Sequence, residues 1–166
     1  ADVFDNVSST VDERRQPTFR NTEPIGQAMT VTYTVDVRPA YYQIMSGDAL
    51  NDIQGNINIT DASEIFTRGI SMNGPATGDW VAWGATLDGT AANKMHDDCT
   101  NGDAVANDSI YTVQFAYEAT QTIGQEFKFG IGGGDNESGY GLNHIENIDV
   151  TSGVVASYWG SINPVK

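Results

Sequence analysis

Basic residues are scarce in this sequence. Its 166 residues include eight Lys and Arg against 22 Asp and Glu, which gives a formal net charge of −14. Proteins bind nucleic acid largely through Lys and Arg that displace counterions from the phosphates, so we do not expect this chain to bind nucleic acid. Anionic membrane surfaces are disfavoured for the same reason. The partners that this charge allows are neutral polymers, cations such as Ca²⁺, and other proteins.

Cysteine is also scarce, and long apolar segments are missing. The single cysteine, Cys99, excludes a framework of internal disulfides. No apolar run approaches the roughly 20 residues that a membrane-spanning helix needs, so we expect no insertion into a membrane. The first residues, ADVFDNV, lack the charged and apolar regions of a signal peptide. An alanine at position 1 is consistent with a processed, exported chain and equally with a trimmed one. From the composition we expect a secreted protein, extracellular or on the cell surface.

Short segments of alternating apolar and polar residues, separated by turns, run through most of the chain. In the clearest, AMTVTYTVDV (28–37), Val31, Tyr33 and Val35 fall on one face and threonines on the other. Turns rich in Gly, Asn and Asp separate the segments. So many short strands predict an all-β protein, built as a sandwich or a barrel. Further strands are predicted at 41–45, 56–60, 64–70, 110–117, 125–131, 144–150 and 153–159, and one or two helical turns at 48–54.

Residues 1–27 have a different composition, mainly polar and containing proline. We predict two parts, an extended N-terminal arm (1–27) and a β-sandwich domain (28–166). Phe4, Val7 and Val11 are the apolar side chains with which the arm would dock on the sheet edge of a neighbouring molecule. Head-to-tail repetition of such strand addition gives a homo-polymer. One hypothesis is therefore an extracellular structural subunit that self-assembles into a filament or surface layer.

The stretch MHDDCTNGDAVANDSIYTVQF (95–115) concentrates short acidic and amide side chains before a strand. Ca²⁺ takes six to eight oxygen ligands, and this stretch could supply several, although its spacing is not that of an EF-hand. Asp and Asn also stabilise turns through side-chain to backbone hydrogen bonds. No apolar wall is evident that would separate the pKa values of a catalytic carboxylate pair. The sequence favours a turn, then a calcium site, and catalysis last; the candidate ligands are Asp97, Asp98, Asn101, Asp103 and Asp108.

No set of catalytic residues emerges from the sequence. His96 and Cys99 are close together, but a zinc site needs three or four such ligands. The segment GIGGGDN follows a predicted strand without opening a helix, which argues against a dinucleotide site. A nucleophilic pair of Cys99 with His144 stays an open alternative. We expect a protein without enzymatic activity.

The aromatic residues suggest a binding surface. Trp80 and Trp83 lie in the loop GDWVAWG with glycine on both sides, and Tyr140 lies between two glycines in the segment 130–144. Exposed rings of this kind stack on the apolar faces of sugars, while the alternative for tryptophan is a place in the core. Both alternatives are open for Trp80 and Trp83, and Trp159, in the last strand, is expected in the core. Tyr140 either contacts a ligand or partner or covers the edge of the sandwich.

Residues 64–148 resemble a carbohydrate-binding module of the starch-binding, early-set Ig-like kind found in secreted bacterial proteins. EIFTRGISMNG resembles the strand that leads into its S-x-N-G-W turn, and MHDDCTNGDAVANDSIYTVQF resembles its aspartate- and glycine-rich hairpin. GQEFKFGIGGGDNESGYGLNHIENI resembles a later strand with its following loop, and VTYTVDV resembles the first strand. The resemblance implies an Ig-like antiparallel β-sandwich. It also implies, as the alternative to a structural subunit, a free-standing module that binds a neutral polysaccharide. Pro75 replaces the tryptophan of the family's sugar platform, which leaves Trp80 or Trp83 as replacements.

Overall fold

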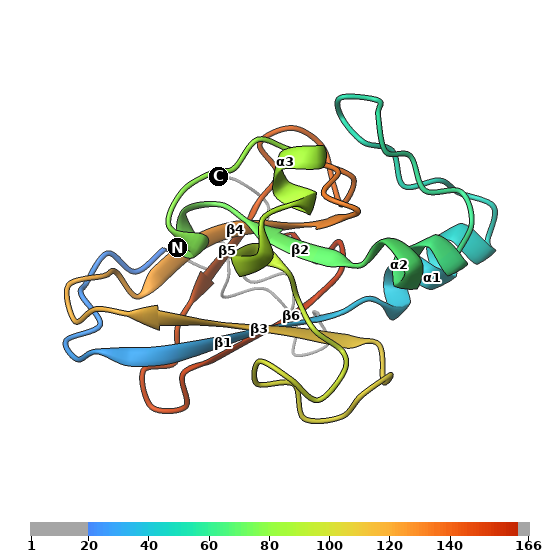
Figure 1. Cartoon of the computed structure of the whole chain (residues 1–166). Helices are drawn as coiled ribbons and strands as arrows, with labels where there is room; N and C mark the ends of the chain where they lie inside the picture. Colours follow the sequence, from blue (N-terminus) through green and yellow to red (C-terminus); the bar gives the residue numbers. More distant parts are fainter. Residues whose placement is uncertain (1–19, 163–166) are drawn as a thin grey trace, which may run out of the picture.

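The computed structural model describes residues 20–162, and β-strands make up most of its regular structure (Figure 1). Its strands form two three-stranded sheets. The order along the chain is β1 (Met29–Asp36), α1 (Arg38–Met45), α2 (Ser63–Arg68), β2 (Ile70–Asn73), the 3₁₀ helix η2 (Pro75–Thr77), α3 (Ala85–Asp88), the 3₁₀ helix η3 (Ala91–Asn93), β3 (Ile110–Tyr117), β4 (Gly124–Ile131), β5 (His144–Asn147) and β6 (Val154–Tyr158).

The two sheets differ in their strand directions. In the first, β1 lies between β3, to which it is antiparallel, and β6, to which it is parallel. In the second, β4 lies between β2 and β5 and is antiparallel to both. The first sheet is therefore mixed, which the sequence-based prediction of an antiparallel arrangement did not include.

Side chains of both sheets meet in one core. The alternation predicted for 28–37 is confirmed, since Val31, Tyr33 and Val35 are fully buried. The ring of Tyr33 packs against Phe127 of β4 with 5.2 Å between the centroids. Its hydroxyl lies 2.7 Å from that of Tyr117, and burial raises the pKa of both phenols, that of Tyr117 to about 12. Trp159 is also buried, as expected.

Two predicted strands are helices instead. Residues 41–45 belong to α1, which has a proline in its first turn and buries Ala40 and Ile44, four residues apart on one helix face. Residues 64–68 belong to α2, where Glu64 and Arg68 form an i,i+4 ion pair of 2.7 Å. Within residues 20–162 no helix is long and apolar enough to cross a membrane.

The connection between α1 and α2 also differs from the prediction. Residues 48–54 contain turns rather than a helix, and the predicted strand 56–60 contributes a single bridge, between Ile59 and Leu50. Asp52 organises this connection, because its carboxylate accepts hydrogen bonds from the N–H groups of Asn56 (3.1 Å) and Ile57 (3.2 Å). Hydrogen bonds to a buried carboxylate therefore hold this connection in place of the regular strand pairing of a hairpin.

The described end of the predicted N-terminal arm lies on its own domain. Ile123 N–H donates to the carbonyl of Glu23 (2.8 Å), Ile25 N–H donates to that of Gln121 (2.8 Å), and the Ile25 side chain is buried in the core. Residues 20–26 are thus attached next to the start of β4. The predicted assembly residues Phe4, Val7 and Val11 lie outside the described residues.

Candidate functional site

The two tryptophans of residues 78–84 lie on a loop that is held by hydrogen bonds at a residue between them and at its end. The Asn73 side chain, at the end of β2, accepts a hydrogen bond from Val81 N–H and donates one to the Val81 carbonyl, each 2.9 Å. Gly84 N–H donates to the carbonyl of Gly133 at 2.7 Å. Asn73 is fully buried, so its two bonds are shielded from competing water. The loop therefore holds both indoles in place without help from a ligand.

Each indole rests against a glycine. A Cβ at Gly130 of β4 would lie 2.8 Å from Cζ3 of Trp83, too close for a real side chain. A Cβ at Gly74 would lie 3.3 Å from Cη2 of Trp80, and Gly74 has a φ of +127° that other residues rarely adopt. The two ring centroids are 6.2 Å apart and the ring planes are inclined by 44°. Trp80 and Trp83 thus form two inclined walls.

The glycine-rich segment after β4 is buried in its first half. Residues 132–137 are buried, and the side chains of Asn136 and Glu137 bond to the backbone of β4. Ile131 N–H donates to Oδ1 of Asn136 and Phe129 N–H donates to Oε2 of Glu137, both at 2.9 Å. Residues 132–137 are therefore not a loose hairpin tip, because the polar side chains of Asn136 and Glu137 are bonded inside the fold.

Tyr140 lies where the same segment reaches the surface. Its side chain is 88% exposed, so it does not cover the edge of a sheet. The backbone just before it is held by Lys128, whose side chain is buried and whose ammonium donates to the carbonyls of Ser138 (3.0 Å) and Gly139 (3.2 Å). The same ammonium forms an ion pair with Asp135. Lys128 thereby fixes the place from which the Tyr140 ring projects.

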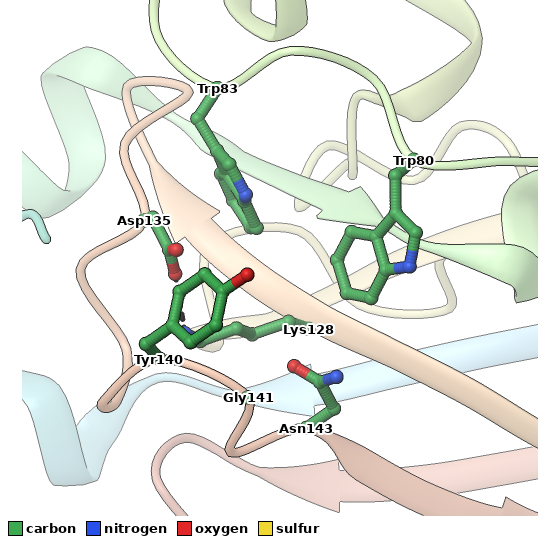
Figure 2. A pocket seen from close by; sticks show the side chains of 7 residues that line it. All are labelled: Trp80, Trp83, Lys128, Asp135, Tyr140, Gly141 and Asn143. Atoms are coloured by element: carbon green, nitrogen blue, oxygen red, sulfur yellow. Dashed lines mark ion pairs between the residues drawn. The ribbon is translucent and has the colours of Figure 1, made fainter. Parts of the chain in front are cut away.

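These segments enclose a pocket of about 260 Å³ (Figure 2). The tryptophans lie on one side of β4 and Tyr140 and Asn143 on the other, with Lys128 between them. The Tyr140 hydroxyl points toward the tryptophans, and the Asn143 amide donates to Oε1 of Glu126 (2.7 Å), which turns its carbonyl oxygen into the pocket. The three residues predicted to bind carbohydrate therefore share one pocket. Its lining consists of Trp80, Trp83, Lys128, Asp135, Tyr140, Gly141 and Asn143.

The charges at the floor of this pocket compensate each other. Burial raises the pKa of Asp135, and its ion pair with Lys128 opposes that effect. An ammonium has three donors, and those of Lys128 face Asp135 and the carbonyls of Ser138 and Gly139. The Lys128 nitrogen also lies 5.9 Å from the centre of the Trp83 ring. The floor consequently offers no free cation to an anionic ligand.

The acidic loop between Met95 and Ile110, at the bottom of Figure 1, uses its carboxylates to hold its own backbone. The two oxygens of Asp97 accept hydrogen bonds from the N–H groups of Asp108 and Ser109, both at 3.1 Å. This arrangement agrees with the predicted turn. Asp98 accepts from Thr100 N–H (3.1 Å), Asp103 from Cys99 N–H (2.7 Å) and Asp108 from Ile110 N–H (2.9 Å), and positive φ angles occur at Cys99, Asn101, Asn107 and Ser109.

A second pocket, of about 480 Å³, lies beside the acidic loop. Burial raises the pKa of Asp97, and burial together with the nearby Asp97 charge raises the pKa of Tyr111 to about 12. Within residues 20–162 no group of three or more His, Cys, Asp or Glu side chains is arranged to hold a metal ion. Asn101, also predicted as a ligand, is exposed and donates to the hydroxyl of Thr100 at 3.3 Å. The calcium site stays a prediction from ligand types. The pocket is lined by Phe66, Met95, His96, Asp97, Asp98, Asn107, Ser109 and Tyr111.

His144 and Cys99 have different environments in the structure. His144 is fully buried, stacks on Phe127 and bonds through Nε2 to Oε1 of Glu137 at 2.8 Å. Cys99 is exposed, and its sulfur accepts a hydrogen bond from Ala106 N–H at 3.2 Å. His144 and Cys99 therefore do not form the nucleophilic pair that the sequence left open.

Sequence reasoning missed the polar residues that line the aromatic pocket or hold its loop. One feature of the sequence could have pointed to Lys128. It is the single cation in the strand QEFKFGI, and an acidic segment follows that strand. Asn143 and Asn73 gave none, because asparagine is common in the loops of this chain and its role depends on what folds beside it.

Comparison with protein families, with curated proteins and with solved structures finds no match to this chain. The resemblance to carbohydrate-binding modules accordingly stays a prediction. The functional argument depends on the site itself.

Proposed function

We propose that this protein is a non-catalytic carbohydrate-binding module that binds a neutral polysaccharide through the aromatic pocket. The observation that carries the proposal is that Trp80 and Trp83 of one loop and Tyr140 of another line one pocket together with the inward-turned amide of Asn143. A sugar ring has apolar C–H faces and a rim of hydroxyl groups. Aromatic rings pack against such faces, and phenol and amide groups bond to such a rim.

The state of the pocket supports the same ligand class. The indoles are seated and their loop is fastened, so little conformational entropy is lost on binding. Because the ammonium at its floor is already paired, the pocket does not attract carboxylates or phosphates. The net charge of −14 repels anionic polymers over longer distances.

The proposal extends to the fold and the location. Residues 28–166 would form an Ig-like sandwich of the carbohydrate-binding-module type, and the core shared by the two sheets supports this finer description. A protein that binds polysaccharide in this way would act outside the cell.

Affinity electrophoresis through gels containing soluble glucans or xylans tests the proposal. The wild type should be retarded by at least one polysaccharide. Trp80→Ala should weaken the affinity by about tenfold or more, or about 1.4 kcal/mol. Trp80 is the better target because its side chain is 39% exposed, whereas Trp83 packs on Gly130 and beside Lys128.

Tyr42→Ala is the matched control, because Tyr42 is an exposed aromatic residue of α1 that does not line the pocket. It should be retarded like the wild type. The proposal is wrong if no polysaccharide retards the wild type, or if Trp80→Ala melts normally and is retarded as strongly as the wild type.

Self-assembly is a second candidate function, and the edge strand β6 favours it. At the two ends of β6, Thr32 N–H donates to the Gly153 carbonyl, and Trp159 N–H donates to the Asp36 carbonyl. The backbone groups of alternate residues face opposite edges of a strand, so the odd-numbered residues face β1. The backbone of Ala156 therefore faces outward. In the described part of the chain no hydrogen bond to this outward N–H or carbonyl is found. The edge VVASY has no charge, proline or bulge that would prevent strand addition.

We propose that the segment containing Phe4, Val7 and Val11 of one molecule adds to β6 of the next, which would give a polymer. Ala156→Pro removes the outward donor without removing a bond to β1, and proline is tolerated at such edge positions. Light scattering and negative-stain imaging should show polymers for the wild type, and folded monomers for Ala156→Pro and for a deletion of residues 1–19. Polymers that persist in the folded Ala156→Pro protein, or a wild type that stays monomeric, would refute self-assembly.

A further inference from the structure

We infer that the aromatic pocket binds a single sugar unit at the end of a chain, rather than a stretch of units within it. This inference rests on the proposed function and narrows its ligand from polysaccharides in general to their terminal units. Three features carry it: the inclination of the indoles, the size of the pocket and the position of its polar groups.

The inclination of Trp80 and Trp83 suits one ring. A planar platform for several successive units needs aromatic rings that are nearly coplanar and spread along the chain. Here the centroids are only 6.2 Å apart and the planes are inclined by 44°. The two indoles therefore form adjacent walls around one pyranose ring, and glycines 74 and 130, which seat them, keep them there.

The size of the pocket leads to the same conclusion. Its volume of about 260 Å³ lies just below the roughly 300–1,000 Å³ that is usual for drug-sized ligands. Tyr140 and Asn143 face the tryptophans across β4, and Lys128 lies between the two sides. A pocket of this volume has room for one sugar unit, which the aromatic and polar side chains would contact on several sides, but not for a longer oligosaccharide segment.

The polar groups of the pocket fit a terminal unit. An internal unit is linked to a neighbour at each end, so the chain must leave the pocket in two directions. A terminal unit leaves in one direction and has a further free hydroxyl at the other end. The Asn143 carbonyl oxygen and the Tyr140 hydroxyl, which face the pocket, are an acceptor and a donor or acceptor for such a hydroxyl.

Changing the number of chain ends at constant mass tests the inference. The polysaccharide that retards the wild-type protein is cut with an endo-acting hydrolase to a much shorter mean length, and binding sites per milligram are measured by isothermal titration. A mock-treated sample of the same polysaccharide is the control. For an end-binding pocket the number of sites per milligram rises in proportion to the number of ends. For a protein that binds internal stretches the number of sites stays constant or falls.

Two variants show that the measured sites belong to the pocket, since Trp80→Ala should lose binding to both samples and Tyr42→Ala should bind both like the wild type. A constant number of sites after cutting would overturn the inference and leave carbohydrate binding intact. The absence of binding to any polysaccharide, cut or uncut, would instead overturn the proposed function itself. The two failures are therefore distinguishable.

Discussion

Asp97 and Asp98 are neighbours with the same side chain, but the fold shifts their pKa values in opposite directions. Asp97 is half-buried and bonds to two N–H groups across the acidic loop, and burial raises its pKa. Asp98 is exposed and bonds to the hydroxyl and N–H of Thr100, which lowers its pKa. The local sequence does not distinguish them, because the difference comes from the backbone of residues 108 and 109, which folds onto Asp97.

Replacing these two residues separates a structural turn from an ion site. Asp97→Ala should reduce the free energy of unfolding by about 1–2 kcal/mol, because the N–H groups of Asp108 and Ser109 lose their partner in a partly buried place. Asp98→Ala should cost clearly less, since water can replace its exposed carboxylate. Urea unfolding of both variants measures the difference, and equal losses would contradict it.

The same experiment repeated with Ca²⁺ and with EDTA tests the calcium prediction. If Asp97, Asp98, Asn101, Asp103 and Asp108 bind the ion, the wild type should be more stable with Ca²⁺, by about 2.7 kcal/mol at a hundredfold excess over Kd. Both aspartate variants should then lose most of that response. A free energy of unfolding that is indifferent to Ca²⁺ and EDTA would leave these carboxylates as turn-forming groups.

At the scale of elements, the sequence predicts long strands better than short helices. The strands β1, β3 and β4 were predicted almost to their ends, because each is eight residues long and at least β1 has one buried and one solvent-facing side. The sequence predicts strands for residues of α1 and α2, because YYQIM and EIF contain aromatic and β-branched residues that favour strands. The helices form because tertiary contacts of Ile44 and Ile65 with the core outweigh that local preference.

The candidate site shows the same division between pattern and context. Its aromatic residues could be selected from the sequence because tryptophan and tyrosine between glycines are conspicuous. Their meeting in one pocket could not be predicted, since it depends on the bonds of Asn73 to Val81 and of Lys128 to Ser138. These bonds order loops whose path does not follow from the local sequence. Burial of residues 132–137 was missed because glycine runs look alike whether they are buried or exposed.

For the whole molecule, the excess of negative charge makes stability depend on pH in two opposing ways. Repulsion among the carboxylates weakens as they are protonated, which stabilises the fold on mild acidification. Burial raises the pKa of Asp97 and Asp135. Their contribution to the free energy of unfolding therefore also favours the folded protein at low pH, and it is lost as pH rises through the raised values. Carboxylates that are held ionised by a partner act in the opposite direction.

Asp36 is the clearest of these opposing carboxylates. It is buried at the end of β1, where hydrogen bonds from the Arg38 guanidinium, at 2.9 and 3.0 Å from its Nε, lower its pKa below the ordinary value of 3.8. A lowered pKa contributes stability above the unfolded value, and this contribution disappears as pH falls through the folded value. The wild type should therefore be most stable on the acid side of neutrality, at about pH 5, and lose stability below about pH 4.

Asp36→Asn should cost most near neutral pH and progressively less below pH 3.8, the ordinary value for this carboxyl. Urea midpoints of both proteins across this pH range give the measurement, and a cost that is constant at every pH would show that the Arg38 bonds do not hold Asp36 ionised in the folded protein.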